Sequence, residues 1–333
     1  MVELRRDPLG GRWVIVDTDY PSLPGDFEKE SHIFKDMACP FCPGNESITP
    51  GEIEVIRAPG SKPNTPGWQV RVVPNKFPAL QIEGELDRRG IGIYDMSRGV
   101  GAHEVIIQTP DHKKEIPDYS DEEAANVLSM YCRRSTDLSN DKRFKYVMIF
   151  KNYGPSAGAS LEHPHTQLIA LPMIPKNVLE EIEGARDYFN YKERCIFCDI
   201  IRQEMHEKER IICENKYYIA LCPYVSRFPF EVWIMPKKHN IHFCQMAKDE
   251  LPELARILKE ALLRLKIALS DPAYNYIIHT APVNTAEPEE GYHWHFEIMP
   301  KLTRVAGFEW GTGFYIVSTP PELAAKYLKG AKI

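Results

Sequence analysis

The 333-residue chain carries one arrangement of cysteine and histidine residues twice, in the same order. Each copy begins with a Cys-x-x-Cys pair and continues to an apolar strand, a proline turn and a single histidine. A helical segment, a second strand and a His-x-His motif then follow. The single histidine and the His-x-His motif lie 51 residues apart in the first copy (112 to 163) and 54 apart in the second (239 to 293). Shared order and near-equal spacing indicate two copies of one folding unit.

The segments between these motifs predict mixed secondary structure in both halves. A capping-box sequence at Ser120 and apolar residues at helical spacing over 251–269 predict two helices. Four apolar runs are typical of strands: 103–107, 146–150, 230–234 and 274–278. Because these elements do not follow a regular βαβ order, we expect an α+β fold with mainly antiparallel sheet and flanking helices. The chain length suits two domains, which we place at residues 1–178 and 179–333.

The repeated cysteines and histidines are the residue types that bind zinc. A structural zinc site needs four thiolate or imidazole ligands, and each half offers that number. The two Cys-x-x-Cys pairs are too far apart for one ordinary zinc ribbon, so we expect two separate sites. The predicted ligands are Cys39, Cys42, His112 and His163 in the first half, and Cys195, Cys198, His239 and His293 in the second. Two alternatives stay open in the second half: His242 or His279 as a ligand, and a further metal at Glu180 or Glu181 with His279, His293 and His295.

The first His-x-His motif also predicts the chemistry. On a strand, His163, His165 and Gln167 point to one face, which places a metal ligand, a second imidazole and an amide in one row. The preceding loop, within 152–160, is rich in Gly and Ser, so its backbone N–H groups can approach an anion. A neutral imidazole is a competent nucleophile near pH 7, and the Gln167 amide can donate to a phosphoryl oxygen. In the second half Glu297 replaces the glutamine, and a carboxylate repels phosphate, so we expect catalysis in the first half only.

Composition argues against several classes of protein. The 41 basic and 47 acidic residues leave a net charge of −6, which disfavours nucleic acid as a partner because its phosphates need a basic surface. No apolar stretch approaches the ~20 residues that span a bilayer, and the N-terminus lacks the apolar core of a secretory signal. We therefore expect a cytoplasmic protein with no nucleic-acid or membrane partner, whose other four cysteines are buried thiols.

Seven longer motifs are spread over nearly the whole chain: Asp7-Pro8-Leu9-Gly10-Gly11-Arg12-Trp13-Val14, Cys39-Pro40-Phe41-Cys42, Pro74-Asn75-Lys76-Phe77-Pro78-Ala79, Pro110-Asp111-His112, residues 152–167, Arg227-Phe228-Pro229-Phe230-Glu231, and Gly307-Phe308-Glu309-Trp310-Gly311-Thr312-Gly313. Together they resemble the galactose-1-phosphate uridylyltransferase family, in the transferase branch of the histidine-triad superfamily. The resemblance implies two tandem histidine-triad-like domains, and a second zinc in some relatives.

The resemblance further implies a ping-pong enzyme that converts UDP-glucose and galactose 1-phosphate into glucose 1-phosphate and UDP-galactose. It implies that His165 carries the uridylyl group and that Gln167 orients the phosphoryl oxygens. The substrate contacts that it implies are Ser160 at the sugar phosphate, Asn75 and Asn152 at the nucleotide, and Phe308 with Glu309 at the hexose, the last two from the partner subunit of a homodimer.

The chain departs from the family pattern directly after the Trp13-Val14-Ile15 stretch. Relatives often carry a basic Arg-x-x-Arg-Pro sequence there, whereas this chain continues Asp17-Thr18-Asp19-Tyr20-Pro21. We expect this loop to turn outward, and Arg71, Lys76 or Arg304 to supply the positive charge. Two alternative functions stay open. One is an adenylyl-transferring phosphorylase that acts on ADP-glucose or a dinucleoside polyphosphate, and the other is a zinc-stabilised nucleotide-binding protein without turnover.

Overall fold

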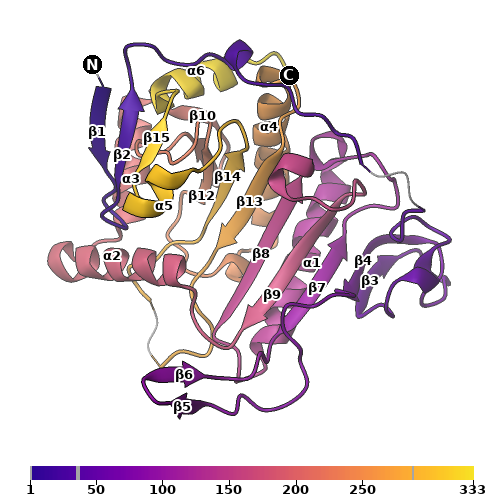
Figure 1. Cartoon of the computed structure of the whole chain (residues 1–333). Helices are drawn as coiled ribbons and strands as arrows, with labels where there is room; N and C mark the ends of the chain where they lie inside the picture. The colour runs from indigo at the N-terminus through magenta and orange to yellow at the C-terminus, as the bar shows by residue number, and fades with distance from the viewer. Residues whose placement is uncertain (1, 35–37, 287–288) are drawn as a thin grey trace.

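The computed structural model describes residues 2–34, 38–286 and 289–333, and its centre is a ten-stranded sheet (Figure 1). The strand order is β10 (Ile211–Glu214), β11 (Tyr218–Leu221), β12 (Val232–Pro236), β14 (His295–Pro300), β13 (Tyr274–His279), β8 (Tyr146–Tyr153), β9 (His165–Leu171), β7 (Ala102–Ile107), β4 (Trp68–Pro74) and β3 (Glu54–Arg57). Every neighbouring pair in this sheet is antiparallel. The predicted α+β class with mainly antiparallel sheet is therefore confirmed.

The sheet contains the repeat that the sequence predicts. In the first half β7, β9 and β8 lie side by side, and in the second half β12, β14 and β13 lie in the same order. The two sets meet where β8 pairs with β13, with Ile149 opposite Ile278. The halves therefore share one continuous sheet, in which His165 and His295 begin the equivalent strands β9 and β14.

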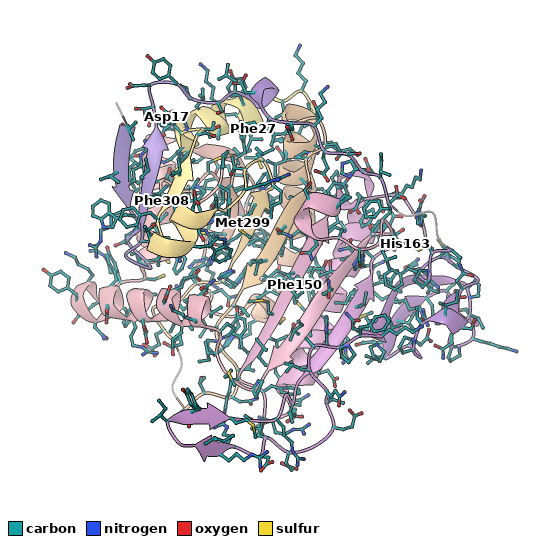
Figure 2. All side chains as sticks on the ribbon, in the orientation of Figure 1. Asp17, Phe27, Phe150, His163, Met299 and Phe308 are labelled. Atoms are coloured by element: carbon teal, nitrogen blue, oxygen red, sulfur yellow. The ribbon has the colours of Figure 1, made fainter. Side chains whose placement is uncertain are left out.

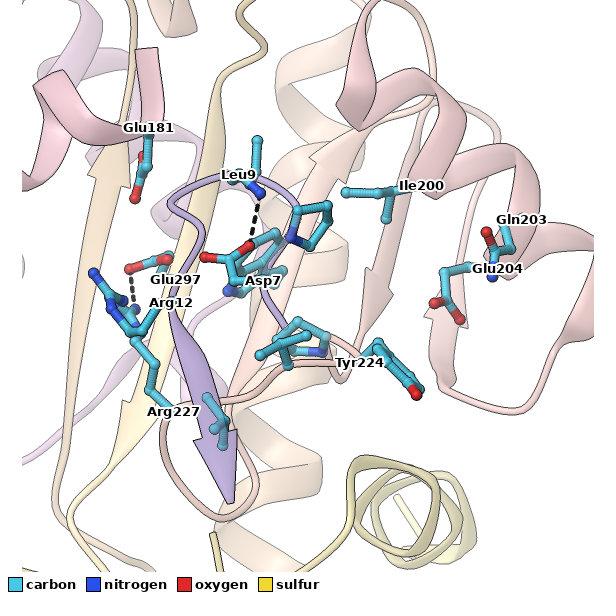
Figure 3. Close-up of a pocket in the computed structure, with 15 residues that line it drawn as sticks. Asp7, Leu9, Arg12, Glu181, Ile200, Gln203, Glu204, Tyr224, Arg227 and Glu297 are labelled. Atoms are coloured by element: carbon cyan, nitrogen blue, oxygen red, sulfur yellow. Dashed lines mark hydrogen bonds and ion pairs between the residues drawn. The ribbon is translucent and has the colours of Figure 1, made fainter. Parts of the chain in front are cut away.

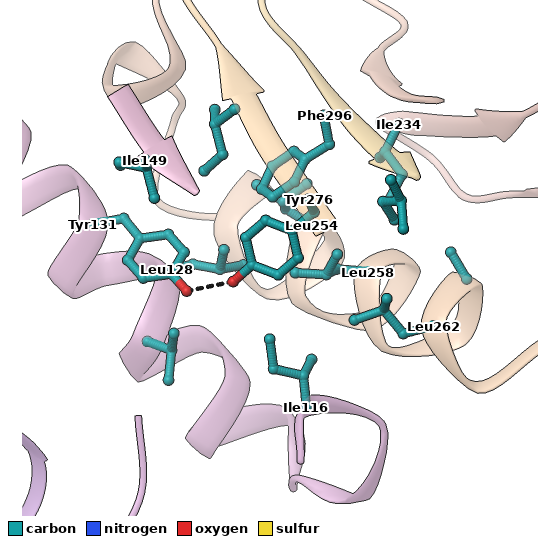
Figure 4. Packing of buried hydrophobic residues seen from close by; sticks show 14 of the residues in the cluster. Ile116, Leu128, Tyr131, Ile149, Ile234, Leu254, Leu258, Leu262, Tyr276 and Phe296 are labelled. Atoms are coloured by element: carbon teal, nitrogen blue, oxygen red, sulfur yellow. Dashed lines mark hydrogen bonds between the residues drawn. The ribbon is translucent and has the colours of Figure 1, made fainter. Parts of the chain in front are cut away.

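Two long helices cover one face of this sheet. α1 (Asp121–Ser139) and α4 (Glu250–Ala268) pack against each other, and Figure 4 shows Leu254 and Leu258 of α4 beside the strand residue Phe296. α1 begins with the predicted capping box. The Ser120 side chain accepts the Glu123 N–H at 3.1 Å, and the Glu123 carboxylate accepts the Ser120 N–H at 2.6 Å.

A buried hydroxyl cluster fixes β9 against this helical layer. Thr166 Oγ1 lies 2.6 Å from Tyr131 OH and 3.1 Å from Tyr276 OH, and Gln108 Nε2 donates to Thr166 Oγ1 at 2.7 Å. Figure 4 shows the contact between the two tyrosine hydroxyls. Buried hydroxyls are stable only when they are hydrogen-bonded, so the cluster sets the rotation of β9. The side chains on either side of Thr166 must then point to the opposite face of the sheet.

The remaining elements flank the second half or stand apart from the main sheet (Figure 1). β1 (Val2–Arg6), β2 (Trp13–Asp17) and β15 (Tyr315–Val317) form a small sheet in which β2 and β15 are parallel. The other elements are α2 (Lys176–Lys192), α3 (Ile196–Glu207), α5 (Gly307–Thr312), α6 (Pro321–Gly330), the hairpin β5 (Arg89–Ile91) and β6 (Tyr94–Met96), and short 3₁₀ helices at Pro24–Asp26, Glu46–Ile48, Ile116–Asp118, Pro155–Ala157 and Phe243–Gln245. α2 packs so closely on the β1–β2 turn that a Cβ at Gly184 would lie 1.8 Å from the Leu9 carbonyl oxygen.

The predicted elements are all found, and one strand begins later than predicted. The strand predicted over 230–234 begins only at Val232, because Phe230 has a φ of 60°, which an extended strand does not allow. Position 178 falls inside α2, so the division of the chain into two domains stays a prediction. In the described ranges, no helix is both long and apolar enough to cross a membrane.

Candidate active site and metal centres

The first predicted metal group comes together at the start of β9. The ligand atoms of Cys39, Cys42, His112 and His163 all lie within 4.8 Å of one another. Cys42 Sγ lies 3.3 Å from His112 Nδ1 and 3.6 Å from His163 Nδ1. Two ligands held about 2.0–2.3 Å from one tetrahedral zinc ion are about 3.6 Å apart. The group therefore has the spacing and the chemistry of a closed structural zinc site.

Hydrogen bonds at the far ring nitrogens leave both Nδ1 atoms available to a metal. His163 Nε2 donates to the Thr109 carbonyl at 2.8 Å, and His112 Nε2 lies 3.0 Å from Glu162 Oε2. Partners of this kind fix the tautomer and the orientation of a ligating imidazole. Because the four ligands come from three distant segments of the chain, a metal here would join those segments.

The second half repeats this arrangement. Cys195, Cys198, His239 and His293 have ligand atoms within 4.8 Å of one another, and Cys198 Sγ lies 3.6 Å from His239 Nδ1 and 3.7 Å from His293 Nδ1. His293 Nε2 donates to the Pro236 carbonyl at 2.9 Å, which matches the bond from His163 to Thr109. Of the alternative ligands, His242 lies outside the group and His279 belongs to a different one.

A third group of possible ligands lies deeper in the second half and consists of Glu181, His279 and His295. This is the further metal group that the sequence left open, except that His293 belongs to the group of Cys195, Cys198 and His239. His279 lies between two carboxylates, with Nδ1 2.8 Å from Glu181 Oε2 and Nε2 3.3 Å from Glu297 Oε2. Burial lowers the pKa of His279, but the two carboxylates outweigh burial and raise it to about 10.

A cavity of about 140 Å³ borders this third group (Figure 3). Figure 3 shows Glu297 ion-paired with Arg227, and Asp7 and Glu181 nearby. Burial raises the pKa of Asp7. Four carboxyl groups (Asp7, Glu181, Glu204 and Glu297) and two arginines (Arg12 and Arg227) line the cavity. Because its carboxyl groups outnumber its cations, it is a poor site for a phosphate.

His295, the equivalent of His165, is also enclosed. Its side chain is fully buried, and its ring centroid lies 5.0 Å from those of Phe197, Trp233 and His279. Within the described ranges its Nε2 has no hydrogen-bond partner. A histidine packed on three sides by rings has no room to receive a phosphoryl group.

His165 opens β9 with one ring nitrogen held and the other available. Its Nδ1 lies 2.8 Å from the His163 carbonyl, so Nδ1 carries the proton and Nε2 keeps its lone pair. The Phe41 ring, between the two cysteines of the first pair, packs 5.4 Å from the His165 ring centroid. Burial lowers the pKa of His165 to about 4, so the imidazole is neutral at pH 7. A cavity of about 210 Å³ borders His165 together with Asn152.

Gln167 is oriented by His103, for which the sequence pattern indicated no functional role. His103 Nδ1 accepts the Ala79 N–H at 3.1 Å, so Nε2 carries the proton and donates to Gln167 Oε1 at 2.8 Å. The oxygen of the Gln167 amide is thereby occupied, and its NH₂ group remains as the donor. Asn75 lies beside the same ring, with Nδ2 3.0 Å from His103 Nε2. The available sequence signal was a histidine at the start of strand 103–107, next to Glu104 and ahead of three apolar residues.

The Gly- and Ser-rich loop 154–160 offers fewer free N–H groups than its sequence predicts. The N–H groups of residues 157–159 donate to carbonyls within the loop, and the Ser156 N–H donates to Glu30 Oε1 at 3.2 Å. The expectation of free backbone donors is therefore wrong for these four residues, because tight-turn hydrogen bonds and Glu30 use them. Ser160 is exposed at the end of the loop.

Phe308 and Glu309 lie away from His165 within one chain. They belong to α5, and Figure 2 places Phe308 and His163 on opposite sides of the molecule. Phe308 is exposed, and Glu309 Oε2 accepts the Ala306 N–H at 2.9 Å. One chain alone therefore does not bring these two residues to the histidine.

Of the cations expected to meet phosphate, Arg71 is unavailable. It is fully buried, donates to Thr49 Oγ1 at 2.9 Å and lies 3.5 Å from Glu52. That expectation is wrong, because Arg71 is used to pack β4 against the preceding loop. Lys76 and Arg304 are both exposed.

The Asp17 carboxylate has a local structural role. Its Oδ1 accepts the N–H groups of Asp19 at 3.1 Å and Tyr20 at 3.0 Å, which closes a turn. Tyr20 is 86% exposed, so this loop faces solvent, as expected.

Comparison with known proteins identifies the family. The N-terminal domain model of galactose-1-phosphate uridyl transferase matches residues 2–175, and the C-terminal domain model matches residues 181–316. The chain belongs to the galactose-1-phosphate uridyl transferase family. The resemblance inferred from the sequence motifs is therefore confirmed.

Individual members of the galactose-1-phosphate uridyl transferase family differ in their named activities. This chain is 35% identical to ADP-glucose phosphorylase of Arabidopsis thaliana, over 98% of this chain and 92% of that protein. It is 29% identical to galactose-1-phosphate uridylyltransferase of Thermotoga maritima, over 100% and 99%. A solved structure of the Arabidopsis thaliana ADP-glucose phosphorylase with bound ADP-glucose superposes with a TM-score of 0.84 at 34% identity and covers 100% of both chains.

Proposed function

We propose that this chain is a nucleotidyltransferase that moves a uridylyl group from UDP-glucose to galactose 1-phosphate through a covalent intermediate on His165. The observation that carries the proposal is the state of that imidazole. Its Nδ1 is held by the His163 carbonyl, its pKa is lowered to about 4, and it lies on the same face as Gln167. A neutral imidazole with one free nitrogen is a nucleophile poised for phosphoryl chemistry.

The first half-reaction forms one bond and breaks one. His165 Nε2 attacks the α-phosphorus of UDP-glucose, the N–P bond forms, and the P–O bond to glucose 1-phosphate breaks, with its electron pair leaving on that oxygen. The ring becomes cationic, and its Nδ1–H still donates to the His163 carbonyl. The Gln167 NH₂ group, which His103 directs outward, donates to a phosphoryl oxygen as charge develops. A phosphate oxygen of galactose 1-phosphate then attacks the same phosphorus, releases UDP-galactose and restores the neutral imidazole.

We propose zinc at both cysteine–histidine groups, with a structural role. Each group supplies two thiols and two imidazoles, and four protein ligands leave no open position for a catalytic water. In the first half the metal would hold the backbone of His163, whose carbonyl orients His165. Bound zinc supplies cross-linking rather than Lewis-acid chemistry in such a closed site.

We propose that the working form is a homodimer, in which Phe308 and Glu309 of a second copy meet the hexose. Their separation from His165 within one chain supports this arrangement.

We also propose that residues 1–178 and 179–333 are two histidine-triad-like domains. In that division β1 and β2 cross over to pair beside β15 of the second. A cytoplasmic location fits the eight free thiols, since thiolate ligands persist in a reducing compartment.

A second candidate function is phosphorolysis of ADP-glucose, in which the same histidine carries an adenylyl group. The Arabidopsis thaliana relative at 35% identity favours it, as does the absence of the N-terminal arginines that many uridylyl-transferring relatives carry. The His165 step is the same for both donors, so the two candidates differ only in the base and in the acceptor.

The experiment that tests the proposal compares kcat/KM for UDP-glucose and ADP-glucose, each with galactose 1-phosphate and with inorganic phosphate as the acceptor. We expect UDP-glucose with galactose 1-phosphate to be preferred. A preference of tenfold or more for ADP-glucose, about 1.4 kcal/mol, would replace the uridylyl assignment by the adenylyl one. If the protein bound nucleotides but turned over neither donor, the function would instead be that of a zinc-stabilised nucleotide-binding protein.

A further inference from the structure

Asn275 belongs to the second half of the chain but makes its side-chain contacts in the first. It lies on β13, where its backbone pairs directly opposite Asn152 of β8. The neighbouring residues Tyr274 and Tyr276 point into the buried layer, so Asn275 points to the face that carries His165 and Gln167. It is half-buried there.

Both N–H groups of the Asn275 amide are used. Nδ2 donates to Asn152 Oδ1 at 2.8 Å and to the Ala157 carbonyl at 2.9 Å. The first bond occupies the oxygen of the Asn152 amide and therefore turns its NH₂ group away from Asn275. That group lies beside the loop, since a Cβ placed on Gly158 would be 3.7 Å from Asn152 Nδ2.

The second bond holds the loop itself. Ala157 lies at the centre of the Gly- and Ser-rich loop, and its carbonyl is anchored by Asn275. The loop begins at Gly154, which has a φ of 82° and packs so closely on Ala273 of the second half that a Cβ there would lie 2.7 Å from the Ala273 Cβ. The second half thus fixes the start and the middle of the loop that leads to Ser160 and His165.

We propose that Asn275 is a positioning residue for the nucleotide: it orients Asn152 to present only a hydrogen-bond donor and sets the position of the 154–160 loop. This inference rests on the proposed function. A donor facing outward from Asn152 recognises acceptor atoms, such as the phosphoryl, ribose or carbonyl oxygens of a nucleotide. The arrangement gives the second half, which lacks a nucleophile, a part in the chemistry of the first.

The test uses Asn275→Asp and Asn275→Ala, with Asn284→Asp as the matched control. An aspartate at 275 cannot donate and can accept from Asn152, which would reverse the polarity of the Asn152 amide. Alanine removes the donor without adding charge. Asn284 is also an asparagine of the second half whose Nδ2 bonds to the first, at 3.0 Å from each of three carbonyls, but these carbonyls lie away from the loop.

Three readouts separate positioning from structural support: the Tm, the KM and kcat for the nucleotide sugar, and equilibrium binding of UMP and AMP. We expect the KM to rise at least tenfold in Asn275→Asp and severalfold in Asn275→Ala, with weaker binding of the nucleoside monophosphate in the same order. Asn284→Asp should lower the Tm without changing the KM or the binding.

Two outcomes would overturn the proposal while leaving the proposed function intact. One is unchanged KM and nucleotide binding in both variants of Asn275, and the other is a change in KM that follows the loss of Tm equally in all three variants. If the wild-type chain bound neither nucleotide and turned over neither sugar donor, the proposed function and this inference would fall together.

Discussion

The hydrogen bond from His103 to Gln167 allows us to predict how much kcat/KM falls when His103 is replaced. Replacing His103 by Phe keeps a ring at this position but removes the Nε2–H that donates to Gln167 Oε1 at 2.8 Å. The Gln167 amide then loses its partner and can flip, so its oxygen faces the phosphoryl group as often as its NH₂ does. The change leaves His165 and the proposed metal ligands in place. It also removes the acceptor of the Ala79 N–H and alters the neighbour of Asn75, so the double variant with Gln167→Ala is needed to isolate the effect on Gln167.

The expected loss follows from two contributions. A hydrogen bond of this type contributes about 0.5–1.5 kcal/mol, and free choice between two amide orientations costs RT ln 2, about 0.4 kcal/mol. Their sum, about 1–2 kcal/mol, corresponds to a fall of about 5- to 30-fold in kcat/KM. Removing the donor altogether in Gln167→Ala should cost more, about 10²–10³-fold, as for other donors to a developing oxyanion.

The assay is the single-turnover rate at which a nucleotide sugar labels the protein, measured in both single variants and in the double variant. Since His103 acts through Gln167, the double variant should be no slower than Gln167→Ala alone. A His103→Phe variant that labels at the wild-type rate would refute this reasoning. Multiplied losses in the double variant would also refute it, because they would show that His103 acts independently of Gln167.

Three further predictions concern stability and metal content. Gly184→Ala should lower the Tm although alanine is the better helix former by about 1 kcal/mol, because its Cβ would collide with the Leu9 carbonyl; an unchanged or higher Tm would contradict this packing. Thr166→Val should cost about 1–3 kcal/mol in denaturant unfolding, because it leaves the buried hydroxyl cluster short of one member, and a neutral result would show that the cluster repairs itself. Cys39→Ser and Cys195→Ser should each remove one zinc per chain by elemental analysis of the purified protein, and retention of both metals in either variant would disprove its ligand set.

The sequence predicted those parts of the molecule that depend on local pattern or on residue type. Strand alternation correctly placed His165 and Gln167 on one face of β9, although His163 lies just before the strand rather than in its row. The shared spacing of the two halves predicted both metal groups, which the fold assembles. Only a few residue types bind zinc, and the ligands of one site must lie together. Candidate ligands can therefore be recognised in the sequence without knowledge of the strand order. The capping box at Ser120 is equally local, and α1 begins beside it.

The features that the sequence did not predict depend on pairing between distant segments. The role of His103 follows from the pairing of β7 with β9, and no spacing in the sequence gives that neighbour. Arg71 looked available for phosphate because its partner Glu52 is close only after β4 folds back on the preceding loop. The backbone N–H groups of residues 156–159 are hydrogen-bonded within a turn or to Glu30, which lies more than a hundred residues away in the sequence.

The most direct test of the account is to trap the covalent intermediate and find the residue that carries it. The protein is incubated with UDP-glucose alone, without an acceptor, then denatured and digested, and the modified peptide is sequenced by mass spectrometry. We predict one uridylyl group, on His165, which is absent from His165→Ala and present in His295→Ala in proportion to the folded protein, and which galactose 1-phosphate removes. Steady turnover without an adduct, an adduct on another residue, or turnover that persists in His165→Ala would contradict the central claim.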